Sequence, residues 1–140
     1  MAIEFDEWNE IKKKTQNETK IWTIKNREIY WLKVGKNLGF ESYGKDKEFL
    51  RPVLVFKKFS KDLFIGLPMT SKIKDSKYYF KFIPMNKKKE NSLMLSQLRA
   101  FSTKRIKSKY GKISVDDYKK VKKEVAKILD INMPHQNGAS

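Results

Sequence analysis

The chain has 140 residues, the length of a single domain, and can bury a modest core without disulfides or a structural metal. It contains no cysteine, which excludes disulfide bridges and thiolate metal sites and leads us to expect a cytoplasmic protein. No apolar run approaches the roughly 20 residues of a membrane helix, and the acidic start, Met1 to Asp6, lacks signal-peptide features.

The net charge favours an anionic partner. Lys and Arg total 32 against 16 Asp and Glu, which gives +16. Such an excess attracts nucleic acid or an acidic protein, although the lysines alone could also simply solvate a small domain. The single histidine, His135, lies in a polar tail, so catalysis would have to proceed without a histidine acid–base pair or a His/Cys zinc site.

Residues 5–19 have the pattern of an amphipathic helix. Phe5, Trp8 and Ile11 recur at three-residue spacing, and lysines occupy the other faces. We therefore expect an N-terminal helix with a narrow apolar stripe.

A second helix is predicted over residues 114–131. Ser114 and Asp117 resemble a capping box. Apolar residues then recur at helical spacing: Tyr118, Val121, Val125 and Ile128. Residues 134–140 are expected to form a flexible tail.

The middle of the chain predicts a sheet, because its apolar residues have strand periodicity. Five strands are expected, at 28–34, 52–56, 63–67, 78–83 and 92–101. The apolar run 52–56 suggests a strand that is buried on both faces. In 92–101, alternation sets Gln97 and Arg99 on one face. The predicted class is α+β, mainly β, with a small, strongly bent five-stranded sheet or barrel between two helices.

Three segments carry polar residues that packing alone does not require: Gly39 to Gly44 with the following Arg51-Pro52, Pro68 to Lys72, and Ser96 to Arg99. Taken singly, each has an ordinary structural explanation. Arg51 is explained as a strand-entry charge, Thr70 as a loop cap and Gln97 as a partner for a buried carbonyl.

Their order along the chain is more specific. The sequence shows Glu-Ile-Tyr-Trp at 28–31, Gly-Phe-Glu at 39–41, Arg-Pro-Val-Leu-Val at 51–55, Pro-Met-Thr-Ser at 68–71 and Leu-Ser-Gln-Leu-Arg at 95–99. These resemble the successive signature blocks of the PemK/MazF toxins of type II toxin–antitoxin systems. The resemblance covers roughly residues 27 to 115. The chain departs from the pattern in its longer loop between Glu41 and Arg51 and in its N-terminal helix.

The resemblance implies an SH3-like barrel core at 27–105 within one domain at 1–133. It also implies a homodimer and a metal-independent, sequence-specific endoribonuclease that cleaves single-stranded RNA and uses no cofactor. The expected protein partner is a cognate antitoxin, acidic and partly disordered until it is bound.

Arg51 and Thr70 match the catalytic pair of the family. In metal-free cleavage the 2′-hydroxyl attacks the adjacent phosphorus, which leaves a 2′,3′-cyclic phosphate and a 5′-hydroxyl. A guanidinium suits phosphate oxygens but is a poor base, so Arg51 is expected to stabilise charge and protonate the leaving group. Thr70 would donate a hydrogen bond to the same phosphate. Glu41 is a candidate general base, and water is the alternative acceptor.

Substrate binding is assigned to residues near this pair. Gln97 and Arg99 would hold RNA from the last predicted strand, with Ser71 and Lys72 beside the catalytic turn. Two loop aromatics, Phe40 and Tyr43, are expected either to stack on unpaired bases or to anchor their loop. A basic run would extend the phosphate track or remain solvated: Lys104, Arg105, Lys107 and Lys109.

Other function classes stay open. A non-catalytic nucleic-acid-binding barrel fits the charge equally well but does not predict Arg51 and Thr70 in matching blocks. A toxin of similar fold that acts on a protein target such as DNA gyrase would need neither residue. A metal-dependent nuclease is disfavoured because four central carboxylates are scattered rather than clustered: Asp46, Glu48, Asp62 and Asp75.

Overall fold

The computed structural model describes residues 21–35 and 49–132. The predicted helix at 5–19, the tail at 134–140 and the loop residues Phe40, Glu41 and Tyr43 lie outside these ranges.

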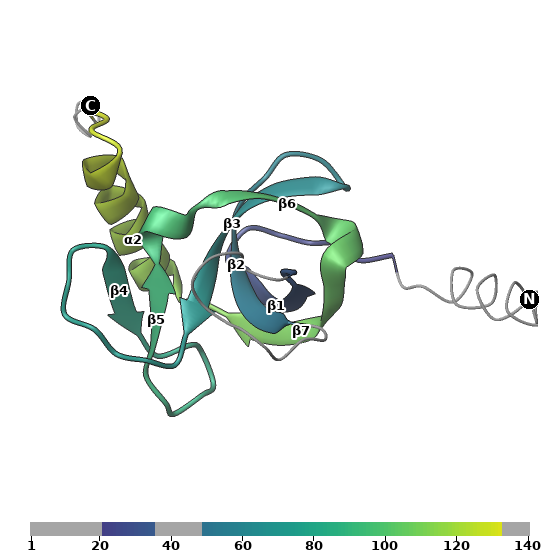
Figure 1. Cartoon of the computed structure of the whole chain (residues 1–140), viewed down its shortest axis with the longest axis horizontal. Coiled ribbons are helices and arrows are strands. Elements are labelled where there is room, and N and C mark those ends of the chain that lie inside the picture. Colours follow the sequence, from purple (N-terminus) through teal and green to yellow (C-terminus); the bar gives the residue numbers. More distant parts are fainter. Residues whose placement is uncertain (1–20, 36–48, 133–140) are drawn as a thin grey trace, which may run out of the picture.

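The described residues form one antiparallel sheet with a single α-helix after it (Figure 1). The strands are β1 (Glu28–Lys33), β2 (Leu50–Lys58), β3 (Leu63–Thr70), β4 (Tyr79–Phe82), β5 (Asn91–Met94), β6 (Arg99–Ser102) and β7 (Ile106–Lys112). Two 3-10 turns, η1 (Leu95–Gln97) and η2 (Thr103–Arg105), and the helix α2 (Val115–Ile128) complete the set. The strand order is β4-β5-β3-β2-β1-β7, and β6 also pairs with β3.

The sheet bends because β3 changes partner along its length. Its first half pairs with β6, from Leu63 to Gly66, and its end pairs with β5, at Met69 and Thr70. Strands β6 and β7 therefore lie at opposite ends of a curled sheet and are joined by η2, so that β1, β2, β3, β6 and β7 surround one core (Figure 1).

The two faces of the central strands contribute to separate cores. Leu54 of β2 joins the outer cluster, which the helix also enters, while Val53 and Val55 join the inner one. All three are fully buried, which confirms the prediction of a strand buried on both faces. The inner cluster also contains Ile24, Tyr30, Leu32, Phe64, Phe101 and Ile106.

Gly66 allows the strands to approach closely inside the curled sheet. A Cβ at this position would lie 2.6 Å from Val53 Cγ1 and 2.9 Å from Phe64 Cε2. Any larger residue would therefore have to displace the inner cluster.

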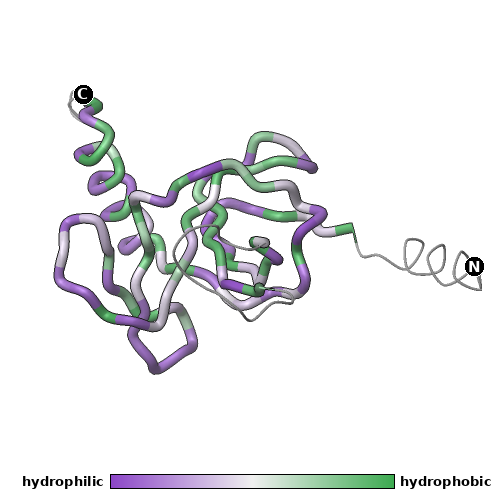
Figure 2. The backbone as a smooth tube through the Cα atoms, viewed as in Figure 1, coloured by the Kyte–Doolittle hydropathy of each residue, from purple (hydrophilic) through white to green (hydrophobic). Residues whose placement is uncertain are grey.

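Helix α2 confirms the predicted C-terminal helix and its cap. Ser114 Oγ accepts a hydrogen bond of 3.1 Å from the amide of Asp117, which satisfies one of the free N–H groups of the first turn. Tyr118, Val121 and Val125 are buried against the outer face of the sheet, and green and purple alternate along α2 in Figure 2, as expected of a helix with one buried face.

The structure corrects the predicted strands in two places. The single strand expected at 92–101 is wrong, because η1 separates β5 from β6. Strand β7 was not predicted, because Ile106 and Tyr110 are its only large apolar residues and two register shifts interrupt its pairing with β1. The described residues thus form seven strands rather than five. No helix in the described ranges is long and apolar enough to cross a membrane.

Candidate active site

Arg51 and Thr70 come together where β2 begins and β3 ends. The two strands pair as far as Val53 opposite Pro68, so Arg51 lies two residues before this pair on β2 and Thr70 two residues after it on β3. Arg51 Nη1 donates a hydrogen bond of 3.2 Å to the carbonyl oxygen of Met69, and both Arg51 and Thr70 are half-buried. The guanidinium is therefore held at the residue before Thr70, and within the described part of the chain this bond uses only one of its N–H groups.

Proline is compatible with this part of β3 because of the change of partner. The pairing with β6 ends at Gly66 and the pairing with β5 begins at Met69, so Pro68 lies in the gap between them. A residue without an N–H is tolerated there because no ladder bond is required on that side. The chain thus reaches Thr70 in a fixed strand conformation.

The turn after Thr70 is organised by its own hydroxyl. Thr70 Oγ1 accepts a hydrogen bond of 3.2 Å from the amide of Lys72. Ser71 and Lys72 follow the threonine directly and are exposed, and their role in binding RNA stays a prediction. The hydroxyl keeps its proton for another acceptor, because this bond occupies only a lone pair.

A row of polar side chains extends from this pair across the sheet. Ser92 of β5 lies opposite Thr70, and Lys81 of β4 lies opposite Ser92. The neighbouring pair of Met69 and Leu93 belongs to the outer hydrophobic cluster, so the row occupies the other face of these strands. Neither Ser92 nor Lys81 could be identified from its own segment, because only the pairing register places them beside Thr70.

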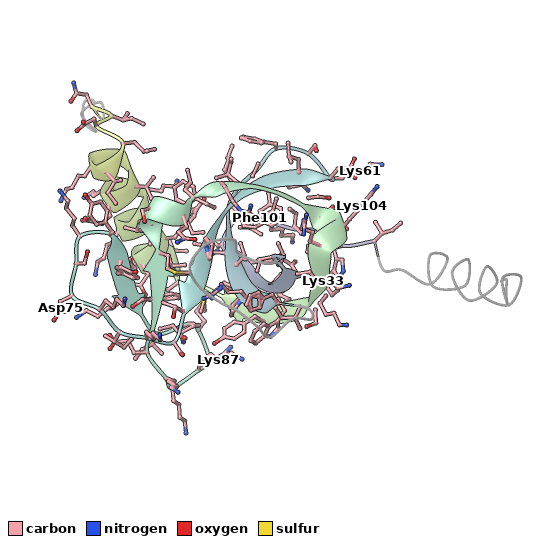
Figure 3. The ribbon with its side chains drawn as sticks, viewed as in Figure 1. Lys33, Lys61, Asp75, Lys87, Phe101 and Lys104 are labelled. Carbon is pink, nitrogen blue, oxygen red and sulfur yellow. The ribbon has the colours of Figure 1, made fainter. Side chains whose placement is uncertain are left out.

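The electrostatics beside the row are predominantly positive. Lys81 Nζ forms an ion pair of 2.7 Å with Asp75, and this hydrogen bond lowers the pKa of the Asp75 carboxyl. Asp75 lies on the opposite side of the molecule from Lys61 and Lys104 (Figure 3). The loop that contains Asp75 also presents exposed lysines at Lys72, Lys74 and Lys77.

Aromatic rings interleave with these lysines. Lys74 Nζ lies 5.4 Å from the ring centre of Tyr79, and Lys77 Nζ lies 5.3 Å from that of Tyr78. Such cation–π pairs keep ammonium groups and flat π-faces together at the surface, the two features that suit phosphates and unpaired bases.

Gln97 and Arg99 do not share a strand face, and that prediction is wrong. Gln97 is exposed in η1, whereas Arg99 begins β6 opposite Gly66. Gly66 is four residues from Thr70 along β3, about 13 Å at the usual rise of a strand. The Arg99 guanidinium lies over the ring of Phe101, with Cζ 4.4 Å from the ring centre. Their role in binding RNA stays a prediction.

A second charged cluster lies at the start of β1, around Glu28. Glu28 accepts hydrogen bonds from Tyr30 Oη and Lys109 Nζ, at 2.5 and 3.1 Å, and from the amide of Lys25 at 2.9 Å. Burial alone would raise the pKa of Glu28, but these donors lower it overall, while burial and the carboxylate raise the pKa of Tyr30. The ion pair between Glu28 and Lys109 joins β1 to β7, and we interpret the cluster as structural.

No three His, Cys, Asp or Glu side chains gather into a possible metal site anywhere in residues 21–35 and 49–132.

Comparison with known proteins connects the fold to a family. A sequence model described as "PemK-like, MazF-like toxin of type II toxin-antitoxin system" matches residues 25–129. The chain therefore belongs to the PemK-like, MazF-like toxin family of type II toxin–antitoxin systems, which confirms the resemblance seen in its sequence blocks. No curated protein matches the chain.

Solved structures of MazF proteins share the fold at low identity. The Mycobacterium tuberculosis toxin MazF-mt6 is 11% identical with a TM-score of 0.58, covering 76% of this chain and 100% of its own. MazF from Deinococcus radiodurans is 15% identical with a TM-score of 0.56, covering 79% and 99%. An endoribonuclease in complex with its cognate antitoxin from a mycobacterial species is 10% identical with a TM-score of 0.60, covering 80% and 100%.

Proposed function

We propose that this chain is the toxin of a type II toxin–antitoxin system and a metal-independent endoribonuclease that cleaves single-stranded RNA at a preferred sequence. The observation that supports this most directly is the hydrogen bond from Arg51 to the carbonyl of Met69, which holds the guanidinium at the residue next to Thr70. A surface that only attracted RNA would not require this pair.

Arg51 stabilises charge in the proposed reaction. The 2′-oxygen forms a bond to phosphorus, the bond from phosphorus to the 5′-oxygen breaks, and negative charge collects on the non-bridging oxygens. One Nη1 bond goes to Met69, and the remaining N–H groups are free to donate to those oxygens. The same fork delivers the proton that the departing 5′-oxygen needs.

Thr70 donates a hydrogen bond to the same phosphate. Its oxygen already accepts the Lys72 amide, which fixes the turn and leaves the hydroxyl proton for the RNA. The proton of the 2′-hydroxyl goes to Glu41 or to water. Glu41→Gln separates these routes: the substitution abolishes the acidic limb of the pH–rate profile if Glu41 is the base and leaves it unchanged if water is.

Substrate binding is proposed to start from the exposed residues beyond Thr70. Ser71 and Lys72 continue from the catalytic turn and contact the phosphates on one side of the cut. Gln97, Arg99, Phe40 and Tyr43 are proposed to bind the flanking nucleotides, and the net charge of +16 draws the RNA to the protein.

The proposed partners are a cognate antitoxin and a second copy of this chain. MazF from Deinococcus radiodurans has been crystallised as a MazE–MazF complex, with 15% identity to this chain. An acidic antitoxin segment would compete with RNA for the Arg51 region, because both are polyanions. Competition between the two for the Arg51→Ala protein tests this; simultaneous binding would contradict a shared site.

The ribonuclease proposal is tested by incubating the protein with a long single-stranded RNA in excess EDTA. Wild type and Lys61→Ala should cut and leave 5′-hydroxyl ends, whereas Arg51→Ala should not. Lys61 is a matched control, because it is an exposed cation just before β3, at the end away from Thr70. RNA that is bound but left intact by wild type would support a non-catalytic binding protein. Growth arrest by an Arg51→Ala toxin would instead support a protein target.

A further inference from the structure

One buried hydroxyl beside the candidate site has no partner. The Ser92 side chain is fully buried, and its Oγ is the single buried side-chain polar atom of the described residues that makes no hydrogen bond. Buried polar groups nearly always find a partner, so an orphan in a native fold needs an explanation.

The pairing register limits what Ser92 can reach. On its own face of the sheet it lies between Thr70 of β3 and Lys81 of β4, directly opposite both. The Cβ atoms of directly opposed residues are about 5 Å apart. A change of the Ser92 rotamer therefore brings its hydroxyl within hydrogen-bond distance of one neighbour or the other.

Only one of these neighbours is an acceptor. The Lys81 ammonium has no lone pair and is already paired with Asp75. Thr70 Oγ1 accepts one hydrogen bond, from Lys72, and has a second lone pair available. Ser92 is fully buried and does not touch RNA itself, so any effect it has on the substrate passes through Thr70.

We propose that Ser92 is a positioning residue, whose hydroxyl donates to Thr70 Oγ1 in the RNA complex and so directs the Thr70 proton to the phosphate. With both lone pairs of Thr70 occupied, by the Lys72 amide and by Ser92, its O–H has one remaining use, which is donation to the substrate. This inference rests on the proposed function of Thr70.

The proposal separates stability from binding. The Ser92 hydroxyl gains a partner only when RNA is bound, so its removal leaves the free protein as stable as before or more so. The same removal weakens the complex, because the Thr70 proton is then no longer directed. A serine that merely filled space would leave RNA binding unchanged on replacement by alanine.

The test uses the full-length protein and a 2′-O-methyl oligonucleotide of the RNA that wild type binds, which cannot be cleaved. Ser92→Ala should keep or raise Tm and weaken binding by roughly three- to tenfold, equivalent to about 1 kcal/mol. Ser92→Ala in a Thr70→Val background should cause no further loss, because the acceptor is gone. Ser92→Cys, a weak donor of similar size, should bind between Ser92→Ala and wild type.

Two results would overturn the inference: equal weakening by Ser92→Ala in both backgrounds, or a lower Tm with unchanged binding. Because the readout is binding, it stands apart from the ribonuclease proposal. A wild type that binds but does not cut contradicts the nuclease and leaves the Ser92–Thr70 coupling to be decided by the double variant. A wild type that does not bind RNA contradicts both.

Discussion

The Arg51 side chain reaches from β2 to the end of β3, where its Nη1 donates a 3.2 Å hydrogen bond to the carbonyl oxygen of Met69. This bond holds the guanidinium beside Thr70 before any substrate arrives. Preorganised donors of this kind cost little reorganisation during a reaction, which is why they contribute strongly to catalysis. The proposed catalytic role of Arg51 therefore relies on this fixed geometry and not on positive charge alone.

Arg51→Lys tests whether cleavage needs the planar guanidinium group of Arg51 or only its positive charge. Lysine keeps the positive charge but cannot hold the Met69 carbonyl and a phosphate with one planar group. We expect single-turnover cleavage to fall by roughly 10²–10³-fold, with RNA affinity reduced far less. Cleavage by Arg51→Lys close to the wild-type rate would show that charge alone suffices.

Gly66→Ala should destabilise the fold through the inner core. The added Cβ would lie 2.6 Å from Val53 Cγ1, and a strand interior gives it no room to move away. Overpacking of this kind costs about 1–3 kcal/mol, measurable by urea unfolding.

Gly111→Ala is the matched control. Gly111 lies in β7, and the nearest atom to its added Cβ would be Lys87 Cε at 3.6 Å, the end of a flexible side chain. Its stability should remain within about 0.5 kcal/mol of wild type. Equal losses at both glycines would contradict the explanation by core packing.

How much the sequence predicted depended on whether a pattern was local. The spacing from Ser114 onward predicts α2, because the capping residues and the helical periodicity both lie within one continuous segment. The apolar run at 52–56 likewise predicts a strand buried on both faces. The break at η1 could not be predicted, since Leu93 and Leu95 continue the alternation while β3 changes partner from β5 to β6.

The candidate site shows the same division. Arg51 and Thr70 were singled out by their sequence blocks, but only the pairing of β2 with β3 brings their two strand ends together. Ser92 and Lys81 were missed, because nothing in their own segments indicates that they lie beside Thr70. Residues joined by strand pairing can be identified only once the register is known.

Glu28 should make stability depend on pH in the acid range. Its pKa is lowered in the folded state from 4.5, so the unfolded chain takes up its proton first as the pH falls. The contribution of Glu28 is therefore fully present above about pH 4.5 and is lost as the pH falls through the folded pKa.

Glu28→Gln tests this sign by urea unfolding across pH. The variant should be less stable than wild type by about 1–3 kcal/mol at neutral pH, because Tyr30 and Lys109 lose their charged acceptor. The difference should shrink below about pH 4.5. A constant difference at all pH values would mean that the carboxylate charge does not contribute.

Lys72 should contribute to RNA affinity in a salt-dependent way. It is an exposed cation two residues after Thr70, and we propose that it neutralises a phosphate next to the proposed cut. Each neutralised phosphate adds about 0.7 to the slope of log K against log salt for a single strand. Lys72→Ala should therefore weaken binding at low salt and reduce the slope by about this amount.

Lys61→Ala removes the same charge before β3, roughly 25 Å away along the strand, and should leave the slope unchanged. Equal slope changes for the two variants would mean that RNA is attracted by the net charge of the surface rather than held at the end of β3.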